Sequence, residues 1–267
     1  MDERLELLDR TDLFVLDMDG TFYLGEQILP GALDFLSAVR ERGKRFLFFT
    51  NNSSKSPEDY IKKLAGMGCA ITREQIMTSG DVTIRYLSTH HPGKTVYLVG
   101  TPALETSFRE SGIPLTRERP DIVVVGFDTT LTYEKLERAC TYIREGALFL
   151  ATHPDINCPV QNGSVPDCGA FCAAIQLSTR KEPRVLGKPF PETADMVLDR
   201  TGGEKCRTAF VGDRLYTDVA TGVRNGAMGL LVLTGETRRE DLADSTVTPD
   251  AVFEGLAEMA ALLRGHD

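Results

Sequence analysis

Short apolar runs of strand length alternate with amphipathic stretches through most of this 267-residue chain. The runs lie at residues 13–16, 46–49, 96–99, 122–125, 148–150, 208–211 and 229–233. Continuous apolar runs of this length are typical of strands buried on both faces, as in a parallel sheet covered by helices. Helical spacing lies between several of them, for example over residues 30–42 and 133–145. The pattern predicts an α/β fold with a mostly parallel sheet.

The order of the runs predicts two domains, which a chain of this length allows. The alternation starts again near residue 95, and this stretch has enough apolar runs to bury a core of its own. The charged, proline-containing segment 180–184 resembles its exit linker. We therefore expect a discontinuous Rossmann-like core domain of residues 1–80 and 182–267, interrupted by a smaller α/β insertion at 81–181.

Composition excludes several classes of partner. Hydrophobic residues make up 42% and charged residues 26%, as in ordinary globular proteins. The formal charge is -9 and no basic block is present, so we expect no nucleic-acid partner. The apolar runs are too short for a membrane span, and the N-terminus is charged where a signal peptide is apolar. We expect a cytoplasmic protein with no membrane partner.

Two carboxylates follow the first apolar run. Asp17 and Asp19 stand before Gly20 and Thr21, which break the strand. Ligands of open α/β sheets bind at the carboxyl ends of the strands. Two acids there can hold a divalent cation, or divide the work of nucleophile and acid/base. The alternative is a solvated acidic turn.

Polar residues follow later strands as well. Thr50 and Asn51 come after the second run, and their hydroxyl and N–H groups suit a phosphate oxygen, although such residues also cap turns. Lys188 stands in a Gly-Lys-Pro turn, where the alternative is a surface lysine. Asp213 follows residues 208–211, and Asp218 lies five residues further on, where it can reach the same site or cap a helix. Chance would seldom place all of these groups after strands in one chain.

This set of motifs resembles the haloacid dehalogenase (HAD) superfamily of phosphatases, over essentially the whole chain. The motifs are Asp17-Met18-Asp19-Gly20-Thr21, Thr50-Asn51, Gly187-Lys188-Pro189 and Gly212-Asp213 with Asp218. The insertion between the second and third motifs is similar to the large α/β cap (C2, class IIA) of the NagD-like subgroup. That subgroup includes p-nitrophenyl, phosphoglycolate and pyridoxal phosphatases. The acid at position 19 excludes dehalogenases and ion-pumping ATPases, which lack it.

The resemblance implies a Mg²⁺-dependent phosphomonoesterase. Asp17 is then the nucleophile that forms an aspartyl-phosphate, and Asp19 is the acid/base. Lys188 offsets the negative charge and, with Thr50 and the Asn51 amide, binds the phosphate. Mg²⁺ is expected on the Asp17 carboxylate, the Asp19 carbonyl and Asp213, with Asp218 behind them.

Substrate choice is expected to fall to the insertion, as a cap over the site. Its specificity loop is placed at residues 153–168, with His153, Asp155 and Asn157 as candidate contacts, followed by Gln161 and Asn162. A structural role in a turn is the alternative for His153. Relatives generally have Pro-Gly-x-Gly where this chain has a Pro-Asp-Cys-Gly sequence at 166–169, so no particular substrate is assigned. The expected ligand is a small phosphorylated metabolite, such as a sugar phosphate, phosphoglycolate, a nucleotide or pyridoxal phosphate. Pairing of copies through the cap is expected from relatives.

Other functions fit some of these residues. A phospho-accepting receiver domain also combines acids, a threonine and a lysine around Mg²⁺, but it is normally much shorter and has no cap. A catalytically retired binding protein is a third hypothesis, against which the intact acids argue. A soft-metal site of His153, Cys158, Cys168 and Cys172 is open as well, although buried thiols are the commoner arrangement.

Overall fold

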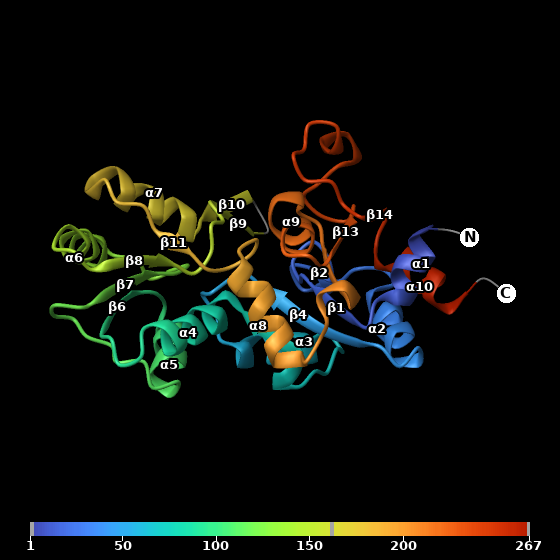
Figure 1. Ribbon diagram of the computed structural model, residues 1–267, viewed down its shortest axis with the longest axis horizontal. Coiled ribbons are helices and arrows are strands. Elements are labelled where there is room, and N and C mark those ends of the chain that lie inside the picture. Colours follow the sequence, from blue (N-terminus) through green and yellow to red (C-terminus); the bar gives the residue numbers. More distant parts are fainter. Residues whose placement is uncertain (1–2, 161–162, 266–267) are drawn as a thin grey trace. The chain divides into compact units, whose positions relative to one another are not determined.

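The computed structural model describes residues 3–160 and 163–265, which form two compact units. The first unit comprises Met1–Phe49, Ile61–Met77 and Lys188–Asp267, and the second comprises Thr50–Tyr60 and Thr78–Gly187. The predicted boundaries after residues 80 and 181 differ by several residues from those after 77 and 187, and residues 50–60, which we expected in the core domain, belong to the second unit. The difference at the second boundary arises because residue 184, in the expected linker, already belongs to a strand of the second unit. Figure 1 shows the elements in sequence colours.

The first unit is built on a six-stranded sheet. Its strands, in spatial order, are β14 (Ala251–Phe253), β13 (Met228–Val232), β12 (Thr208–Gly212), β1 (Leu13–Leu16), β4 (Arg45–Thr50) and β5 (Ile76–Thr78). Strand β1 pairs in parallel with both β4 and β12, and Leu16 lies opposite Phe48 and Val211. All four residues of β1 are buried, as the continuous apolar run predicts. The carboxyl ends of β1, β4 and β12 therefore lie at one edge of the sheet.

Helices of the first unit cover this sheet. They are α1 (Glu3–Arg10), α2 (Ala32–Glu41), α3 (Pro57–Gly66, shared with the second unit), α8 (Pro191–Thr201), α9 (Ala220–Arg224) and α10 (Leu256–Arg264). Helix α10 packs against α1 and α2, and α8 packs against α9. A short antiparallel pair, β2 (Tyr23–Leu24) and β3 (Gln27–Ile28), follows β1.

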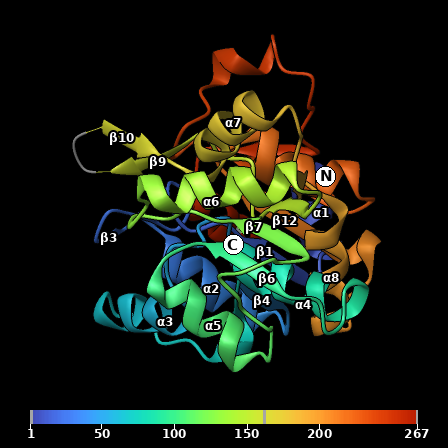
Figure 2. The same cartoon turned by 90° about the vertical axis from the view of Figure 1, so that its left-hand side faces the viewer.

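The second unit has a parallel sheet of its own. Its strands, in spatial order, are β11 (Arg184–Val185), β8 (Leu148–Ala151), β7 (Ile122–Val125) and β6 (Val96–Val99). Helices α6 (Tyr133–Arg144) and α7 (Cys168–Thr179) lie on one face of it, and α4 (Ser79–His90) and α5 (Pro102–Glu110) lie on the other (Figures 1 and 2). An antiparallel hairpin, β9 (Asn157–Val160) and β10 (Gly163–Pro166), precedes α7.

The prediction of an α/β fold with mostly parallel sheets is confirmed. Within the described residues, no helix has the length and apolar character needed to cross a membrane.

Candidate active site

The turn that follows β1 positions the first acid. The Met18 carbonyl accepts hydrogen bonds from the N–H groups of Thr21, Phe22 and Tyr23, at 3.3, 2.9 and 3.0 Å. Asp17 N–H donates to the Val211 carbonyl of the neighbouring strand at 2.9 Å. The chain thus turns sharply just beyond Asp17, whose carboxylate stays at the tip of the sheet.

Lys188 joins two acids, Asp17 and Asp218, that are far apart along the chain. Its Nζ donates to Asp17 Oδ1 at 2.6 Å and to Asp218 Oδ1 at 2.5 Å. A longer contact of 3.4 Å reaches the Phe49 carbonyl at the end of β4. Lys188 is only 3% exposed, so the surface-lysine alternative is wrong.

Local turns hold the second acid pair. Asp213, directly after β12, accepts hydrogen bonds from the Glu236 N–H at 2.7 Å and from the Thr21 hydroxyl at 3.3 Å. Asp218 lies in a single π-helical turn, Leu215–Val219, and its Oδ2 accepts from the Arg214 N–H at 3.1 Å. Such π-turns are frequent at functional sites. Both acids are buried, so the alternative of a solvated Asp213 is wrong.

Glycine leaves the space that this arrangement needs. A methyl group at Gly212 would lie 2.2 Å from Asp218 Cγ. One at Gly20, whose φ is +85°, would lie 2.6 Å from Asp213 Oδ2. Larger residues at either position would displace an acid of the site.

Burial and crowding perturb the titration of the site. Burial raises the pKa of Asp17 well above its usual value, with Lys188 opposing this shift and Asp218 and Asp213 adding to it. Burial, followed by the charge of Asp218, raises the pKa of Asp213 to about 6. For Lys188, burial acts to lower the pKa, but Asp17 and Asp218 raise it overall. The site is therefore a buried cluster of negative charge that one lysine only partly neutralises.

This cluster fits a hard divalent cation. One carboxylate oxygen from each of Asp17, Asp213 and Asp218 can be chosen so that all lie within 4.8 Å of one another. Oxygen donors of this kind are what Mg²⁺ prefers. Within the described ranges, this is the one group of three or more histidine, cysteine or acidic side chains with such geometry. His153, Cys168 and Cys172 do not form one, and the two thiols are buried.

Asp19 lies apart from the lysine pair. It is half-buried, and its Oδ2 accepts a hydrogen bond from the Tyr23 hydroxyl at 3.1 Å. Tyr23 is fully buried and its backbone bridges to Asp19 across the turn. One carboxylate oxygen of Asp19 is thus bound by the Tyr23 hydroxyl.

The predicted phosphate-binding pair belongs to the second unit. Thr50 ends β4, and its hydroxyl accepts a hydrogen bond from the Asn52 N–H at 3.1 Å. The side-chain amide of Asn51 donates to Asp155 Oδ2 at 3.0 Å, and the Asn51 carbonyl accepts from the Ser79 hydroxyl. Both residues are buried, and their place relative to Asp17 stays a prediction.

His153 lies in a buried polar network of the second unit. Its Nε2 is 2.9 Å from Asp167 Oδ1, and its Nδ1 is 2.8 Å from the Thr152 hydroxyl and 3.4 Å from that of Ser79. His153 is 0% exposed. The geometry favours a structural role for its ring, and direct contact with substrate stays a prediction.

The remaining specificity candidates differ in exposure. Asp155 is buried against Asn51, whereas Asn157 is exposed at the start of β9. Gln161 and Asn162 lie outside the described residues.

Several residues of the site were not assigned a role from the sequence. Thr21, Phe49 and Tyr23 contact Asp213, Lys188 and Asp19, respectively. Thr21 ends the first motif and Phe49 directly precedes the second, which is the signal that could have identified them. Ser79 lies far from the motifs in sequence, and no local pattern marks it. Asp167 lies in the unusual Pro-Asp-Cys-Gly sequence at 166–169, but nothing there points to His153 as its partner.

Comparison with known families agrees with this geometry. Residues 14–114 match the family described as haloacid dehalogenase-like hydrolase, and residues 185–259 match a second model described as HAD-hydrolase-like. The segment between these two matches lies in the second unit.

Individual relatives match nearly end to end. An acid sugar phosphatase of Staphylococcus aureus is 36% identical over 251 residues, which cover 94% of this chain and 97% of the relative. A 4-nitrophenylphosphatase structure from Thermotoga maritima is 48% identical with a TM-score of 0.93, covering 96% and 99% of the two chains. NagD from E. coli K-12 is 29% identical with a TM-score of 0.87, covering 93% and 98%. The chain therefore belongs to the haloacid dehalogenase-like hydrolases, within their NagD-type phosphatase subgroup.

Proposed function

We propose that this enzyme is a Mg²⁺-dependent phosphomonoesterase that hydrolyses small phosphorylated metabolites through an aspartyl-phosphate on Asp17. The observation that carries the proposal is the buried cluster in which Lys188 Nζ lies 2.6 Å from Asp17 and 2.5 Å from Asp218. Phosphoryl transfer asks a protein mainly for positioning and charge neutralisation. A lysine that stays charged between two acids supplies the charge neutralisation.

Asp17 would attack phosphorus with the carboxylate oxygen that Lys188 leaves free. Its hydrogen bond to Lys188 orients the carboxylate and stabilises its ionised form. When the phosphate arrives, the same ammonium group offsets the repulsion between two anions. The ester oxygen then leaves as the aspartyl-phosphate forms.

Asp19 would protonate that leaving oxygen and then accept a proton from the water that hydrolyses the intermediate. One of its oxygens is held by the Tyr23 hydroxyl, which fixes the plane of the carboxyl group and leaves the other oxygen available. Thr50 and the Asn51 backbone amide would hold the remaining phosphate oxygens.

Asp17, Asp213 and the Asp19 carbonyl would hold the magnesium ion, and Asp218 would support them through Lys188 and the Arg214 N–H. The raised pKa values of Asp17 and Asp213 support this assignment, because uncompensated buried acids are costly and a cation relieves them. When bound, Mg²⁺ neutralises charge that develops on the transferring phosphoryl group.

For the substrate class we favour sugar phosphates. A relative with 36% identity over 94% of this chain is named an acid sugar phosphatase, which supports this choice. We assign substrate selection to the second unit as a cap, with Asp155 and Asn157 as contacts and His153 as a weaker candidate. Asn157 is the exposed member of this group and hence the most accessible to a substrate.

The test is phosphate release from a panel of sugar phosphates, phosphoglycolate, nucleotides and pyridoxal phosphate, with Mg²⁺ and with EDTA. We expect many turnovers that EDTA abolishes, and sugar phosphates at the head of the ranking. Asp17→Asn keeps the size of the side chain but removes the nucleophile, so it should abolish turnover while the protein stays folded. A single burst of phosphate uptake, no release at all, or substantial turnover by the Asp17→Asn enzyme would each overturn the mechanism.

A further inference from the structure

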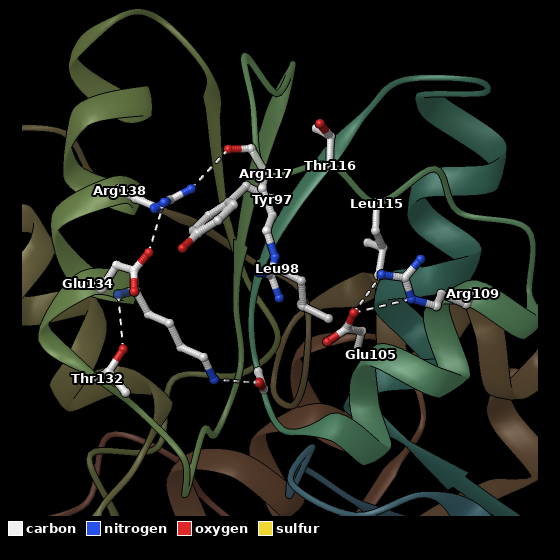
Figure 3. A pocket seen from close by; sticks show the side chains of 12 residues that line it. Tyr97, Leu98, Glu105, Arg109, Leu115, Thr116, Arg117, Thr132, Glu134 and Arg138 are labelled. Carbon is white, nitrogen blue, oxygen red and sulfur yellow. Dashed lines mark hydrogen bonds and ion pairs between the residues drawn. The ribbon is translucent and has the colours of Figure 1, made fainter.

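The second unit contains a pocket of about 370 Å³ beside β6, the edge strand of its sheet (Figure 3). Strand β6 supplies Tyr97 and Leu98, helices α5 and α6 supply charged side chains, and the segment after α5 supplies Arg117. Its volume falls within the range of small-molecule sites, about 300–1,000 Å³. None of the residues that line it belongs to the predicted catalytic, metal-binding or phosphate-binding set.

Tyr97 presents an unused hydroxyl to this pocket. The residue is only 6% exposed, and its ring packs edge-on against Tyr142 with 5.3 Å between ring centroids. Its hydroxyl forms no hydrogen bond with any residue in the described part of the chain. Burial raises the pKa of Tyr97, while the charges of Arg138 and Arg117 act in the opposite direction. The hydroxyl is therefore a donor that a ligand in the pocket can use.

The backbone of Arg117 is fixed by hydrogen bonds, whereas its guanidinium group is not. Its carbonyl accepts hydrogen bonds from the Tyr142 hydroxyl at 2.5 Å and from Arg138 at 3.4 Å. Its guanidinium group makes no ion pair or hydrogen bond with the residues that the structure describes. Figure 3 shows the side chain beside Leu98, directed into the pocket. Arg117 is an exposed residue with a fixed backbone, so its five N–H donors are open to solvent and to a ligand.

The other charges of the pocket largely neutralise one another. They form the ion pairs Arg109–Glu105 at 2.6 Å, Arg138–Glu134 at 2.8 Å and Lys135–Asp128 at 2.6 Å. Arg117 is left as the cation without a counter-charge among the described residues, on a chain whose formal charge is -9. The pocket is thus a local positive site with acidic and apolar walls.

We propose that this pocket binds the phosphate group of a small hydroxylated molecule, such as a sugar phosphate, through Arg117 and the Tyr97 hydroxyl. A guanidinium fork matches two phosphate oxygens, and the phenol supplies a third donor. The carboxylates of Glu105 and Glu134 accept hydrogen bonds from the hydroxyl groups, and Leu98 covers the carbon skeleton. This site is independent of the proposed active site.

The test is a titration of the ¹⁵N-labelled full chain, in EDTA to prevent turnover, with inorganic phosphate and separately with glucose 6-phosphate. We expect amide shifts at residues 97–98, 115–117 and 134–138, with glucose 6-phosphate binding more tightly than inorganic phosphate because it also meets the carboxylates. Arg117→Gln should weaken glucose 6-phosphate at least about tenfold, the cost of a charge-assisted pair. Tyr97→Phe keeps the packed ring but removes the hydroxyl, so it should weaken glucose 6-phosphate binding several-fold.

Two controls separate this inference from the proposed function. Arg144→Gln is the control for Arg117→Gln. Arg144 ends helix α6, which contributes other residues to the pocket, but Arg144 itself does not line it, so the affinity for glucose 6-phosphate should stay unchanged. Lys188→Met is expected to lose turnover but to keep the shifts of the pocket amides. Absence of shifts at those amides at millimolar ligand, shifts that Arg117→Gln leaves intact, or equal affinity for the two probes would overturn the proposal.

Discussion

Lys188 is the shared cation of the acidic cluster in the first unit, because its ammonium group contacts both Asp17 and Asp218. Replacing it with methionine keeps the length of the side chain but leaves Asp17 and Asp218 without a shared cation. We expect turnover to fall by about 10³-fold, as for loss of a preorganised donor. Without Mg²⁺, the free energy of unfolding should fall by about 3–5 kcal/mol, the usual cost of breaking a buried pair. Steady-state kinetics and urea unfolding measure the two effects.

The matched control for that experiment is Lys135→Met. Lys135 also pairs with a buried acid, Asp128 at 2.6 Å, but in the second unit. It should lose some stability and keep turnover. Turnover of Lys188→Met within tenfold of the wild-type value would contradict the role of Lys188.

The pair of His153 and Asp167 should make stability depend on pH. Burial acts to lower the pKa of His153, but Cys168 and Asp167 more than offset it and raise the pKa to about 9, against 6.5 ordinarily. A raised folded-state pKa contributes stability that is fully present below 6.5 and is lost as pH rises through about 9. For His153 alone the contribution is about 3 kcal/mol. The Cys168 thiol acts in the opposite direction: burial acts to raise its pKa, but Cys172 and the charge of His153 lower it to about 7, so its contribution grows as pH rises toward 9. The net decline is therefore smaller than the His153 contribution. Urea unfolding at pH 6, 7.5 and 9.5 measures it.

Asp167→Asn tests this assignment. Asparagine keeps the N-cap of α7 but removes the negative charge, so the decline between pH 6.5 and 9 should shrink. Asp128→Asn removes an equally buried carboxylate whose partner is a lysine, and the decline should remain. Identical pH profiles for the wild type and Asp167→Asn would refute the role of the pair.

The sequence indicated the acids and the lysine of the site because each follows a strand of one parallel sheet, and such strand ends converge. It did not reveal partners that lie in other elements. Asp167 lies where the resemblance implies a glycine, and for this reason no particular substrate was assigned from the sequence. The structure shows that its carboxylate lies 2.9 Å from His153 Nε2 and caps α7. No pattern in a single sequence links positions 153 and 167.

At the scale of elements, the turn after β1 depends on Gly20. Two separate features require glycine at this position: its φ is +85°, and an added methyl group would lie 2.6 Å from Asp213 Oδ2. Gly43 has only the first of these features: its φ is +66°, but an added methyl group would have no atom within 4 Å. We expect Gly20→Ala and Gly43→Ala each to lose about 1 kcal/mol of stability through backbone strain. Only Gly20→Ala should also lose turnover, by tenfold or more, because it moves Asp213.

Circular dichroism melts and phosphate release distinguish the two alanine variants. Equal turnover in both would mean that the turn tolerates displacement of Asp213.

Elements were predictable where the apolar run was long and the neighbouring strands were parallel. The runs at 13–16, 96–99 and 122–125 coincide with β1, β6 and β7. The short pairs β2–β3 and β9–β10 and the two-residue β11 were not predicted. Strands of two to four residues with exposed positions carry little periodicity, and their pairing is set by turns and tertiary contacts.

At the scale of the whole molecule, one buried cluster of three acids and a single lysine is left for a cation to stabilise. A ligand that binds only the folded state adds about 2.7 kcal/mol at a hundred times its dissociation constant. Mg²⁺ should therefore raise the melting temperature of the first unit by several degrees, and the rise should saturate. Asp213→Asn should abolish this increment even if it stabilises the metal-free protein by removing one buried charge. Asp128→Asn, in the second unit, should keep the increment in full. Calorimetry with Mg²⁺ and with EDTA decides the matter, and a shift of equal size in the Asp213→Asn protein would mean that Mg²⁺ binds elsewhere.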